Sequence, residues 1–308
     1  MSSGETDPQK LNGSWHDWSG QALSEPLGRG ALYADGFFTT CKLRAGRIEY
    51  GDLHVARMIK SADALKLRLP EGFDEDLRKL AHNLTHHSGS GVLKLYVQRL
   101  PQDRRDAPNL MKRRGYAPST SQVHLAWQFF EHAGLMSEEL ISINPAVNAV
   151  LLTQKVSLVP DNLAGLKTLA RLDQVLAAAE LSEQRQQFAD SDLEGITLDL
   201  ADQLCEGVSH NLCLLIGGQW VTPELKRSGI HGVFRAALLK HGLVHSCALN
   251  LDDLKRAQGA VLINSVRGLI PLKSINVSGS LIALDGGSGR HLAELIRQNT
   301  AFMSDILC

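Results

Sequence analysis

The sequence predicts a mixed α/β or α+β fold in two domains, and three observations support this. The chain has 308 residues, which suggests two domains at roughly 150 residues each. Strand-like and helix-like patterns alternate in both halves. A polar stretch broken by Gly134 is the best linker. We therefore expect a polar leader at 1–25, a small N-terminal α/β domain at 26–131, a linker at 132–138 and a larger C-terminal α/β domain at 139–308.

The overall composition favours a soluble cytoplasmic protein. Hydrophobic residues make up 44% of the chain, charged residues 21%, and the formal net charge is −1. This charge gives no electrostatic case for nucleic acid or an anionic membrane as a partner. The basic cluster between Arg104 and Arg114 is short and lacks interleaved aromatic residues. No apolar run approaches the ~20 residues that span a bilayer, and the polar start predicts no secretory signal.

Five scattered cysteines lack any C-x-x-C pair. This pattern favours reduced thiols over a disulfide framework, and it provides no spacing for a metal site. We therefore expect no metal. The cysteines are Cys41, Cys205, Cys213, Cys247 and Cys308.

The N-terminal half predicts strands around two helices. The stretch 31–50 indicates two β segments joined at Gly46. Helical stripes follow, and strands are expected near 92–100 and 122–130. A basic, proline-rich loop separates these two strands. The stripes are Leu53, Ala56, Ile59, Ala62 and Leu65 in the first helix, and Leu77, Leu80 and Leu84 in the second.

The C-terminal half predicts a hairpin, several short helices and further strands. The dipeptide within "IGGQ" at 216–219 is a hairpin signal between two β runs. A short amphipathic helix is expected to end at Gly242. The remaining elements are a strand-like start at 141–159, a helix at 161–180, a strand at 244–250, a helix at 251–259, a strand at 260–266 and one closing helix at 289–307.

A lysine stands at the predicted start of the helix in "DNLAGLKTLARLDQVLAAAE", residues 161–180. The leucines of this stretch recur at three- and four-residue steps, which predicts a core-facing side. Lys167 would then lie in the first turn, where the helix dipole disfavours a cation. Gly165 would let another group approach the backbone closely. The leucines are Leu166, Leu169, Leu172 and Leu176.

This segment resembles the lysine segment of fold-type IV pyridoxal-phosphate enzymes. That group includes branched-chain and D-amino-acid aminotransferases and 4-amino-4-deoxychorismate lyase, whose segment, roughly L-A-G-x-K-x-L-N-R-L-E-Q-V-L, is the most similar. The resemblance extends from about Gly28 to Pro271. It implies a two-domain fold with the active site between the domains, and pyridoxal 5'-phosphate as cofactor.

By this resemblance, Lys167 binds the cofactor covalently and acts as the catalytic base. The chemistry requires an amine that is neutral near pH 7, and desolvation, a cationic ring or a helix N-terminus lowers the pKa of a lysine. The alternative is a surface lysine at a helix start.

The stretch "LCEGVSHNLCLL" resembles the family's T-E-x-x-x-x-N-(L/I)-F segment. Glu206 is therefore expected to pair with the cofactor's pyridine nitrogen, which keeps the ring protonated. Cys205 replaces the family's Thr, whereas Asn211 is retained. The alternative is an exposed strand glutamate.

Three segments resemble phosphate-binding motifs of the family. "HVAR" makes Arg57 the expected clamp on the cofactor phosphate. "SGIHGVFR" would direct the amides of Ile230 and His231 at the phosphate from a helix start, unless it is a plain turn. "INSVRGLIP" adds Asn264 and Ser265 to the cofactor shell.

The choice of reaction depends on a single residue. "YADGFFTT" resembles the F-G-D-G-x-F-(E/T)-T motif, in which lyases tend to carry Thr, and this chain has the catalytic candidate Thr39. The loop "RRGY" resembles the lyase-like "GRGY". Arg114, Tyr116 and Arg267 are the expected substrate-binding residues, or else ordinary surface side chains. Ala170 departs from the family's Asn.

The resemblance implies a carbon–oxygen lyase that converts 4-amino-4-deoxychorismate into 4-aminobenzoate and pyruvate for folate synthesis. It also implies a homodimer. The alternatives are a class IV aminotransferase for branched-chain or D-amino acids, a non-catalytic relative that keeps the fold, and a nucleic-acid binder that uses the basic loop.

Overall fold

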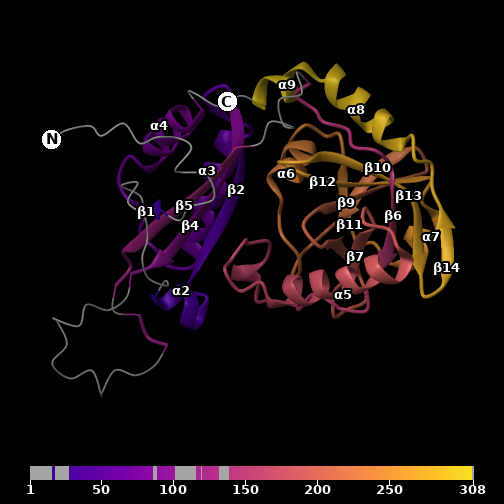
Figure 1. Ribbon diagram of the computed structural model, residues 1–308, viewed down its shortest axis with the longest axis horizontal. Coiled ribbons are helices and arrows are strands. Elements are labelled where there is room, and N and C mark those ends of the chain that lie inside the picture. Colours follow the sequence, from indigo (N-terminus) through magenta and orange to yellow (C-terminus); the bar gives the residue numbers. More distant parts are fainter. Residues whose placement is uncertain are drawn as a thin grey trace. The chain divides into compact units, whose positions relative to one another are not determined.

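The computed structural model describes residues 16–17, 28–85, 89–100, 116–118, 120–131 and 139–306. The chain divides into two compact units (Figure 1). Of the described residues, unit 1 contains those up to 131 together with Lys167–Ala170, and unit 2 contains the rest. Each unit combines a sheet with helices, so the expected mixed fold class is confirmed. The expected linker at 132–138 lies outside the described residues.

Unit 1 is built on a five-stranded antiparallel sheet in the order β1-β5-β4-β2-β3. The expected strands and the turn at Gly46, whose φ is 82°, are confirmed, except that residues 31–33 of the expected first β segment belong to a helix and its strand begins at Gly36. Two residues of the expected leader form β1, which pairs with β5. The strands are β1 (His16–Asp17), β2 (Gly36–Arg44), β3 (Arg47–Ile48), β4 (Ser90–Arg99) and β5 (Val123–Glu131).

Helices α3 and α4 share one apolar core with this sheet. The predicted side of α4 (Phe73–Thr85) is buried as expected, whereas that of α3 (Gly51–Ala64) is shifted. In α3, Ile59 is 48% exposed, and the buried face instead includes His54 and Met58. The α3 pattern therefore predicted the helix but misplaced its face. A further short helix, α2 (Gly28–Tyr33), precedes β2.

Unit 2 contains a nine-stranded sheet that closes on itself. The strand order is β11-β10-β9-β12-β13-β6-β7-β8, with β14 paired to β13, and β8 also pairs with β9 at Glu206 and Asn211. Closure gives β8 a hydrogen-bonded neighbour on both sides, β7 and β9. The strands are β6 (Val147–Leu151), β7 (Glu194–Leu198), β8 (Leu204–Gly207), β9 (Asn211–Ile216), β10 (Gln219–Pro223), β11 (His245–Cys247), β12 (Gly259–Asn264), β13 (Gly268–Val277) and β14 (Ser280–Ala283).

Turn and cap signals in unit 2 are confirmed. Gly217 and Gly218 both have positive φ and join β9 to β10, as the hairpin motif predicts. Gly242, with φ 65°, follows α6 (Val233–Lys240). The expected closing helix is instead two helices, because Asn299 leaves the helical conformation and caps the second through Phe302 N. The other helices are η4 (Asp161–Leu163), α5 (Leu172–Phe188), α7 (Leu251–Arg256), α8 (Ser288–Gln298) and α9 (Thr300–Asp305).

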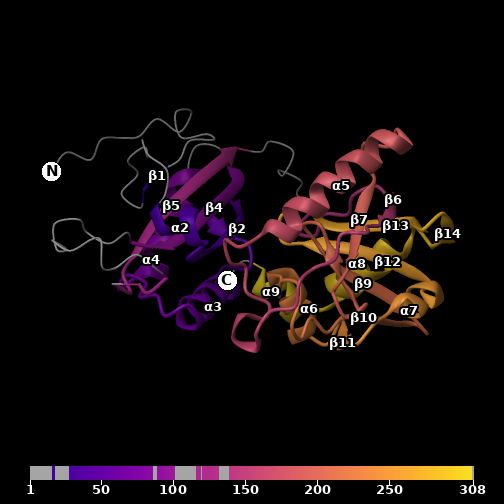
Figure 2. The ribbon, with the colours of Figure 1, turned by 90° about the horizontal axis from the view of Figure 1, so that it is seen from below.

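Helix α5 lies beside β7 (Figure 2), and Ala177 and Leu181 pack into a small core there. Of the leucines expected to face the core, Leu166 is buried, but the two that lie in α5 are exposed. Leu172 is 68% exposed and Leu176 is 46% exposed, so the predicted buried side of this helix is wrong. The period of the pattern was helical, but small Ala177 contacts the sheet instead.

The helix also begins later than expected. It starts at Leu172, five residues after Lys167. The backbone around Lys167 is extended because Phe38 N donates to Lys167 O and Leu169 N donates to Gly36 O, both at 3.0 Å. These bonds attach Lys167–Ala170 to β2 of unit 1, although the expected domain boundaries assigned the lysine to the C-terminal domain. No helix dipole acts on Lys167 from α5's first turn.

No helix within the described ranges is long and apolar enough to cross a membrane. The four described cysteines are free thiols: Cys41, Cys205, Cys213 and Cys247.

Candidate active site

Lys167 lies on the extended segment next to β2. Its Nζ lies 4.7 Å from the centroid of the Phe38 ring, on the strand that carries Thr39. The side chain is half-buried. An amine over an aromatic face loses part of its hydration while keeping an attraction for the ring. The contact with Phe38 fixes the position of the Lys167 amine beside β2.

A polar cluster connects Thr39 of β2 to His54 and Arg57 of α3. Thr39 Oγ1 is 2.8 Å from Nδ1 of His54, and Nη2 of Arg57 donates to the same hydroxyl oxygen. Arg57 Nη2 is also 3.5 Å from His54 Nδ1. Thr39 and His54 are both fully buried. The sequence brings these groups together because His54 and Arg57 are one helical turn apart.

The surroundings of this cluster shift two pKa values. Burial lowers the pKa of the Arg57 guanidinium to about 10, which still leaves it charged at neutral pH. Burial, then Arg57 and then Lys167, hold the pKa of His54 well below its usual value. His54 is therefore an uncharged imidazole beside a buried cation.

Arg57 has unused binding capacity. Its Nε is buried without a hydrogen-bond partner, and no ion pair joins Arg57 to an acid in the described part of the chain. A buried cation without a counter-charge is costly unless a ligand supplies one. A phosphate provides acceptors that match the planar guanidinium. The site therefore fits the phosphate that the resemblance implies.

Glu206 is the expected cofactor-binding acid of unit 2. It is buried in β8, and its Oε2 accepts a hydrogen bond from Ile230 N at 2.8 Å. Its Oε1 accepts from Gln174 Nε2 at 3.3 Å. These bonds hold the Glu206 carboxylate in a fixed orientation. The alternative of an exposed glutamate is wrong.

The 228–232 turn is held from two sides. Asn211 Nδ2 donates to Ile230 O at 2.8 Å, and Gly232 N donates to Asn211 Oδ1 at 3.2 Å. Gly229 has φ 66°, and a Cβ there would lie 3.1 Å from Glu206 Oε2. Gly229 therefore permits the close approach between the turn and Glu206.

The amides expected to face a phosphate are engaged within unit 2. Ile230 N donates to Glu206, and His231 N donates to Gly165 O at 3.0 Å. The predicted use of these two amides differs from their bonding here, because the turn hydrogen-bonds to the loop before Lys167. Gly165, with φ 73°, has His231 so near that a Cβ would be 2.3 Å from its ring. The expected close approach at Gly165 is confirmed.

The 264–267 turn is shaped by Asn264. Its Oδ1 accepts from Val266 N at 3.0 Å and from Arg267 N at 2.7 Å, and its Nδ2 donates to Ser209 O at 3.3 Å. These bonds use Asn264 to fix the turn that presents half-buried Ser265. Ser265 is therefore better placed than Asn264 to contact a cofactor.

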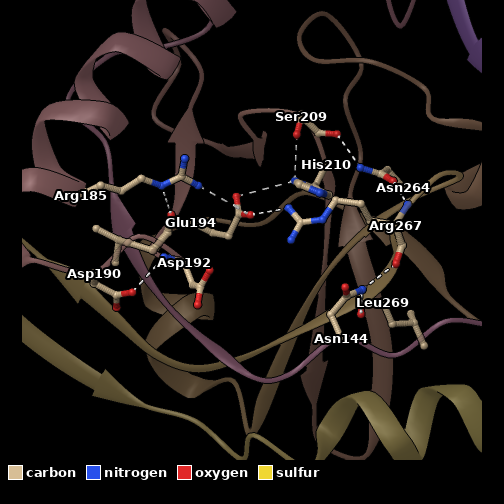
Figure 3. A network of polar contacts seen from close by, with 11 residues as sticks. Asn144, Arg185, Asp190, Asp192, Glu194, Ser209, His210, Asn264, Arg267 and Leu269 are labelled. Carbon is tan, nitrogen blue, oxygen red and sulfur yellow. Dashed lines mark hydrogen bonds and ion pairs between the residues drawn. The ribbon is translucent and has the colours of Figure 1, made fainter. Parts of the chain in front are cut away.

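Arg267 is paired with a buried acid. Figure 3 shows Glu194 of β7 between Arg185, His210 and Arg267. The Arg267 Nη1 to Glu194 Oε1 distance is 2.9 Å, and Arg185 Nη2 and His210 Nδ1 lie 4.0 and 3.9 Å from the carboxylate. The Arg267 side chain is 49% exposed. Glu194 therefore orients a guanidinium whose other N–H groups can still meet a substrate.

The expected loop residues are only partly described. Arg114 lies outside the described residues. Tyr116 is 83% exposed, its carbonyl accepts from Arg29 Nη2 at 2.9 Å, and its ring meets Tyr33 edge-on. Within the described ranges, no cluster of His, Cys, Asp and Glu side chains could hold a metal.

Comparison with known proteins identifies the family. A sequence profile described as amino-transferase class IV matches residues 36–275. The chain belongs to the amino-transferase class IV family. This confirms the resemblance that began with the Lys167 segment, and the class IV match includes every described candidate from Thr39 to Arg267.

Two class IV relatives extend over most of the chain. Aminodeoxychorismate lyase of Vibrio harveyi is 28% identical over 262 residues, which are 82% of this chain and 87% of the relative. The crystal structure of 4-amino-4-deoxychorismate lyase from Pseudomonas aeruginosa has a TM-score of 0.74 at 28% identity, over 92% of this chain and 98% of that one.

More distant class IV structures share the fold. The branched-chain amino acid aminotransferase of Escherichia coli has a TM-score of 0.70 at 16% identity, covering 93% of this chain and 94% of that one. The PLP-bound form of a hypothetical aminotransferase from Mycobacterium tuberculosis has a TM-score of 0.68 at 19% identity, covering 96% and 99%.

Sequence reasoning missed His54 and Glu194. His54 stands three residues before Arg57 in the same quoted motif, and this spacing was the available signal for a shared helix face. Glu194 had no local signal, because its partners come from α5, the β8–β9 connection and the β12–β13 turn.

Proposed function

We propose that this chain is a pyridoxal-phosphate-dependent lyase that converts 4-amino-4-deoxychorismate into 4-aminobenzoate and pyruvate. The observation that carries the proposal is the 28% identity, over most of the chain, to two proteins named as lyases for this substrate. Thr39, rather than the glutamate common among aminotransferases of the fold, supports the same choice.

Pyridoxal 5'-phosphate is the expected cofactor, and each unit has residues whose chemistry suits a part of it. Lys167 would hold it covalently, Arg57 and Ser265 would bind its phosphate, and Glu206 would pair with its ring nitrogen. When bound, the cofactor supplies a protonated ring that accepts an electron pair. The half-buried Arg57, whose buried Nε has no hydrogen-bond partner in the described structure, is the structural feature that supports this fit.

The chain's own contribution to the reaction is a proton transfer. We propose that the neutral Lys167 amine removes the proton from the ring carbon that bears the substrate's amino group. The adjacent carbon–oxygen bond breaks, the ring becomes aromatic, and the enolpyruvyl group leaves with its oxygen and becomes pyruvate after protonation. Because aromatisation favours elimination, the protein's main task is orientation of the C–H bond and the ether.

Substrate carboxylates call for fixed cations. Arg267 is the proposed carboxylate ligand, because Glu194 orients its guanidinium while half of the side chain stays exposed. Arg114 and Tyr116 remain proposed contacts by resemblance. We also propose a cytoplasmic homodimer acting in folate synthesis. The exposed Leu172 and Val175 of α5 are apolar surface that a second copy could cover, and sedimentation analysis would test this.

The decisive experiment measures both products. Purified protein with added pyridoxal phosphate is incubated with 4-amino-4-deoxychorismate, and pyruvate and 4-aminobenzoate are quantified together. We expect equal amounts of the two products from the native chain and at least ~10³-fold less from Lys167→Ala.

The alternative reaction is tested in parallel. Branched-chain and D-amino acids are offered with 2-oxoglutarate, and the new amino acid is measured. Catalytic amino transfer without pyruvate release from aminodeoxychorismate would replace the lyase proposal with an aminotransferase. The absence of both reactions, with no cofactor absorbance, would indicate a non-catalytic relative.

A further inference from the structure

We propose that His54 is a positioning residue: its uncharged imidazole receives the Thr39 hydroxyl at Nδ1 and thereby fixes that hydroxyl oxygen as the acceptor for Arg57. This inference rests on the proposed function, because it assumes that Arg57 binds the cofactor phosphate. It assigns a role to the histidine that precedes Arg57 by three residues in the "HVAR" segment.

The first step is geometric. His54 and Arg57 come from one face of α3, and both reach the same hydroxyl oxygen of β2. The three atoms Thr39 Oγ1, His54 Nδ1 and Arg57 Nη2 form a triangle, in which the longest described side, between the two nitrogens, is 3.5 Å. One nitrogen of the Arg57 guanidinium, Nη2, therefore contacts both the β2 hydroxyl and the α3 imidazole.

The second step concerns the protons. A guanidinium nitrogen only donates, so Arg57 Nη2 occupies a lone pair of the hydroxyl. Nδ1 lies beside this cation, and a lone pair there is attracted to it whereas an N–H would be repelled. The Nδ1-acceptor tautomer is thus favoured, and the Thr39 O–H donates to it. Nε2 of His54 is buried without a partner in the described structure, so the Nδ1 side orients the ring.

The third step concerns charge. The ionisable groups that affect His54 are Arg57 on its own helix and Lys167 on the segment beside β2, and both are basic. Cys41, two residues after Thr39 on β2, has its pKa raised to about 12 by burial and stays a neutral thiol. A protonated imidazole would therefore have no described counter-charge. An uncharged acceptor can hold the hydroxyl without adding a second buried cation beside Arg57.

The consequence is orientation of Arg57. Its guanidinium has no described acid to fix it, so the hydroxyl and imidazole fix one nitrogen and leave the rest of the planar fork for a ligand. A pre-oriented guanidinium loses less freedom when it binds phosphate. We expect His54 to affect phosphate binding specifically, and not the binding of the rest of the cofactor.

The experiment compares two amides in place of the imidazole. In His54→Asn the side-chain oxygen takes the place of Nδ1, whereas in His54→Gln the amide reaches toward Nε2 instead. The cofactor-free full-length variants are titrated with pyridoxal phosphate and with pyridoxal, and binding is followed by absorbance. Thermal unfolding of each cofactor-free variant checks its fold.

We expect His54→Gln to weaken pyridoxal phosphate binding about tenfold, the scale of one lost hydrogen bond. His54→Asn is expected to stay within about threefold of the native chain. Neither variant is expected to change pyridoxal binding by more than about twofold. Thr39→Val is expected to match His54→Gln, and Thr39→Ser to match the native chain, which provides a second test if the histidine variants fail to fold.

A double-mutant cycle locates the effect. In an Arg57→Met background, His54→Gln is expected to cause no further loss of phosphate-dependent binding, because its effect acts through Arg57. Equal losses with pyridoxal, equal effects of Asn and Gln, or an undiminished loss in the Arg57→Met background would each overturn the proposal. A native chain that binds no pyridoxal phosphate would instead refute the proposed function.

Discussion

Two charged side chains, buried Glu194 and half-buried Arg57, differ in how the protein matches their charge. Glu194 in unit 2 is matched by Arg267 at 2.9 Å, with Arg185 and His210 nearby. Arg57 in unit 1 has only neutral partners, Thr39 and His54, among the described residues. Glu194 lies on strand β7 of the unit 2 sheet, and Arg57 lies on helix α3 of unit 1.

The difference indicates what each charge is for. A buried ion matched by the protein's own residues completes its electrostatics on folding, so its loss is expected to affect stability. A buried cation without a protein counter-charge is incomplete until an anion binds, so its loss is expected to affect binding. Glu194 is therefore expected to stabilise the folded chain, whereas Arg57 is expected to destabilise it until an anion binds.

The largest expected effect is at Arg57. Arg57→Met removes the charge while keeping an apolar side chain of similar length. Because an unmatched phosphate would remain, we expect pyridoxal phosphate affinity to fall about 10³-fold, about 4 kcal/mol. The cofactor-free variant is expected to be as stable as the native chain or more so. A titration and a urea unfolding curve measure the two quantities, and unchanged affinity would contradict the comparison.

Glu194→Gln is the opposite variant. It leaves Arg267 and Arg185 without their buried counter-charge, so we expect the unfolding free energy to fall by about 3 kcal/mol. Pyridoxal phosphate affinity is expected to stay within about threefold. Urea unfolding of the cofactor-free protein provides the measurement, with Glu183→Gln on α5 as a control that changes the same residue type. Loss of affinity equal to that of Arg57→Met would remove the distinction.

The pH dependence of the unfolding free energy tests whether His54, the neighbour of Arg57, is neutral in the folded chain. The folded chain lowers the pKa of His54 below its unfolded value of about 6.5, so the unfolded state binds more protons and stability rises with pH. This contribution is fully present above about pH 6.5 and is lost as pH falls below it, by up to ~1.4 kcal/mol per pH unit. The difference between native and His54→Asn stability, measured from about pH 7.5 to about pH 5, is expected to show this slope. A difference independent of pH would contradict a neutral His54.

The smallest expected effect is at Arg185. It lies at 4.0 Å from Glu194 and is 38% exposed, so solvent screens much of its interaction. Arg185→Met is expected to lower the unfolding free energy by about 0.5–1 kcal/mol. The same urea assay checks it, and a loss as large as that from Glu194→Gln would show that Arg185, rather than Arg267, is the main partner.

Local signals predicted much of the fold. The hairpin at Gly217, the end of α6 before Gly242 and the strands of unit 1 follow from turn and alternation patterns. The start of α5 did not, because hydrogen bonds from β2 hold Lys167 in an extended conformation that no neighbouring residue encodes. The buried face of α3 was misplaced because a histidine, counted as polar, occupies its centre.

The candidate site shows the same limit. Motifs pointed to Arg57 and Glu206, and side-chain chemistry explains why each suits its expected partner. Other contacts join segments far apart in sequence. Arg267 pairs with Glu194, and the His231 amide donates a hydrogen bond to Gly165 O. Such contacts depend on how strands are ordered in the sheet, which periodicity along one chain does not specify.

The reactivity of a buried thiol in this chain reports on local opening of the fold. Cys41 lies on β2 beside Thr39 and is fully buried, whereas Cys247 is half-exposed. An alkylating reagent needs the thiolate and physical access, so Cys41 reacts only when the layer between β2 and α3 opens. The alkylation rate of Cys41, followed by mass spectrometry, therefore measures how often the contact between β2 and α3, the helix that carries Arg57, opens locally. A ligand that binds Arg57 is expected to slow this rate.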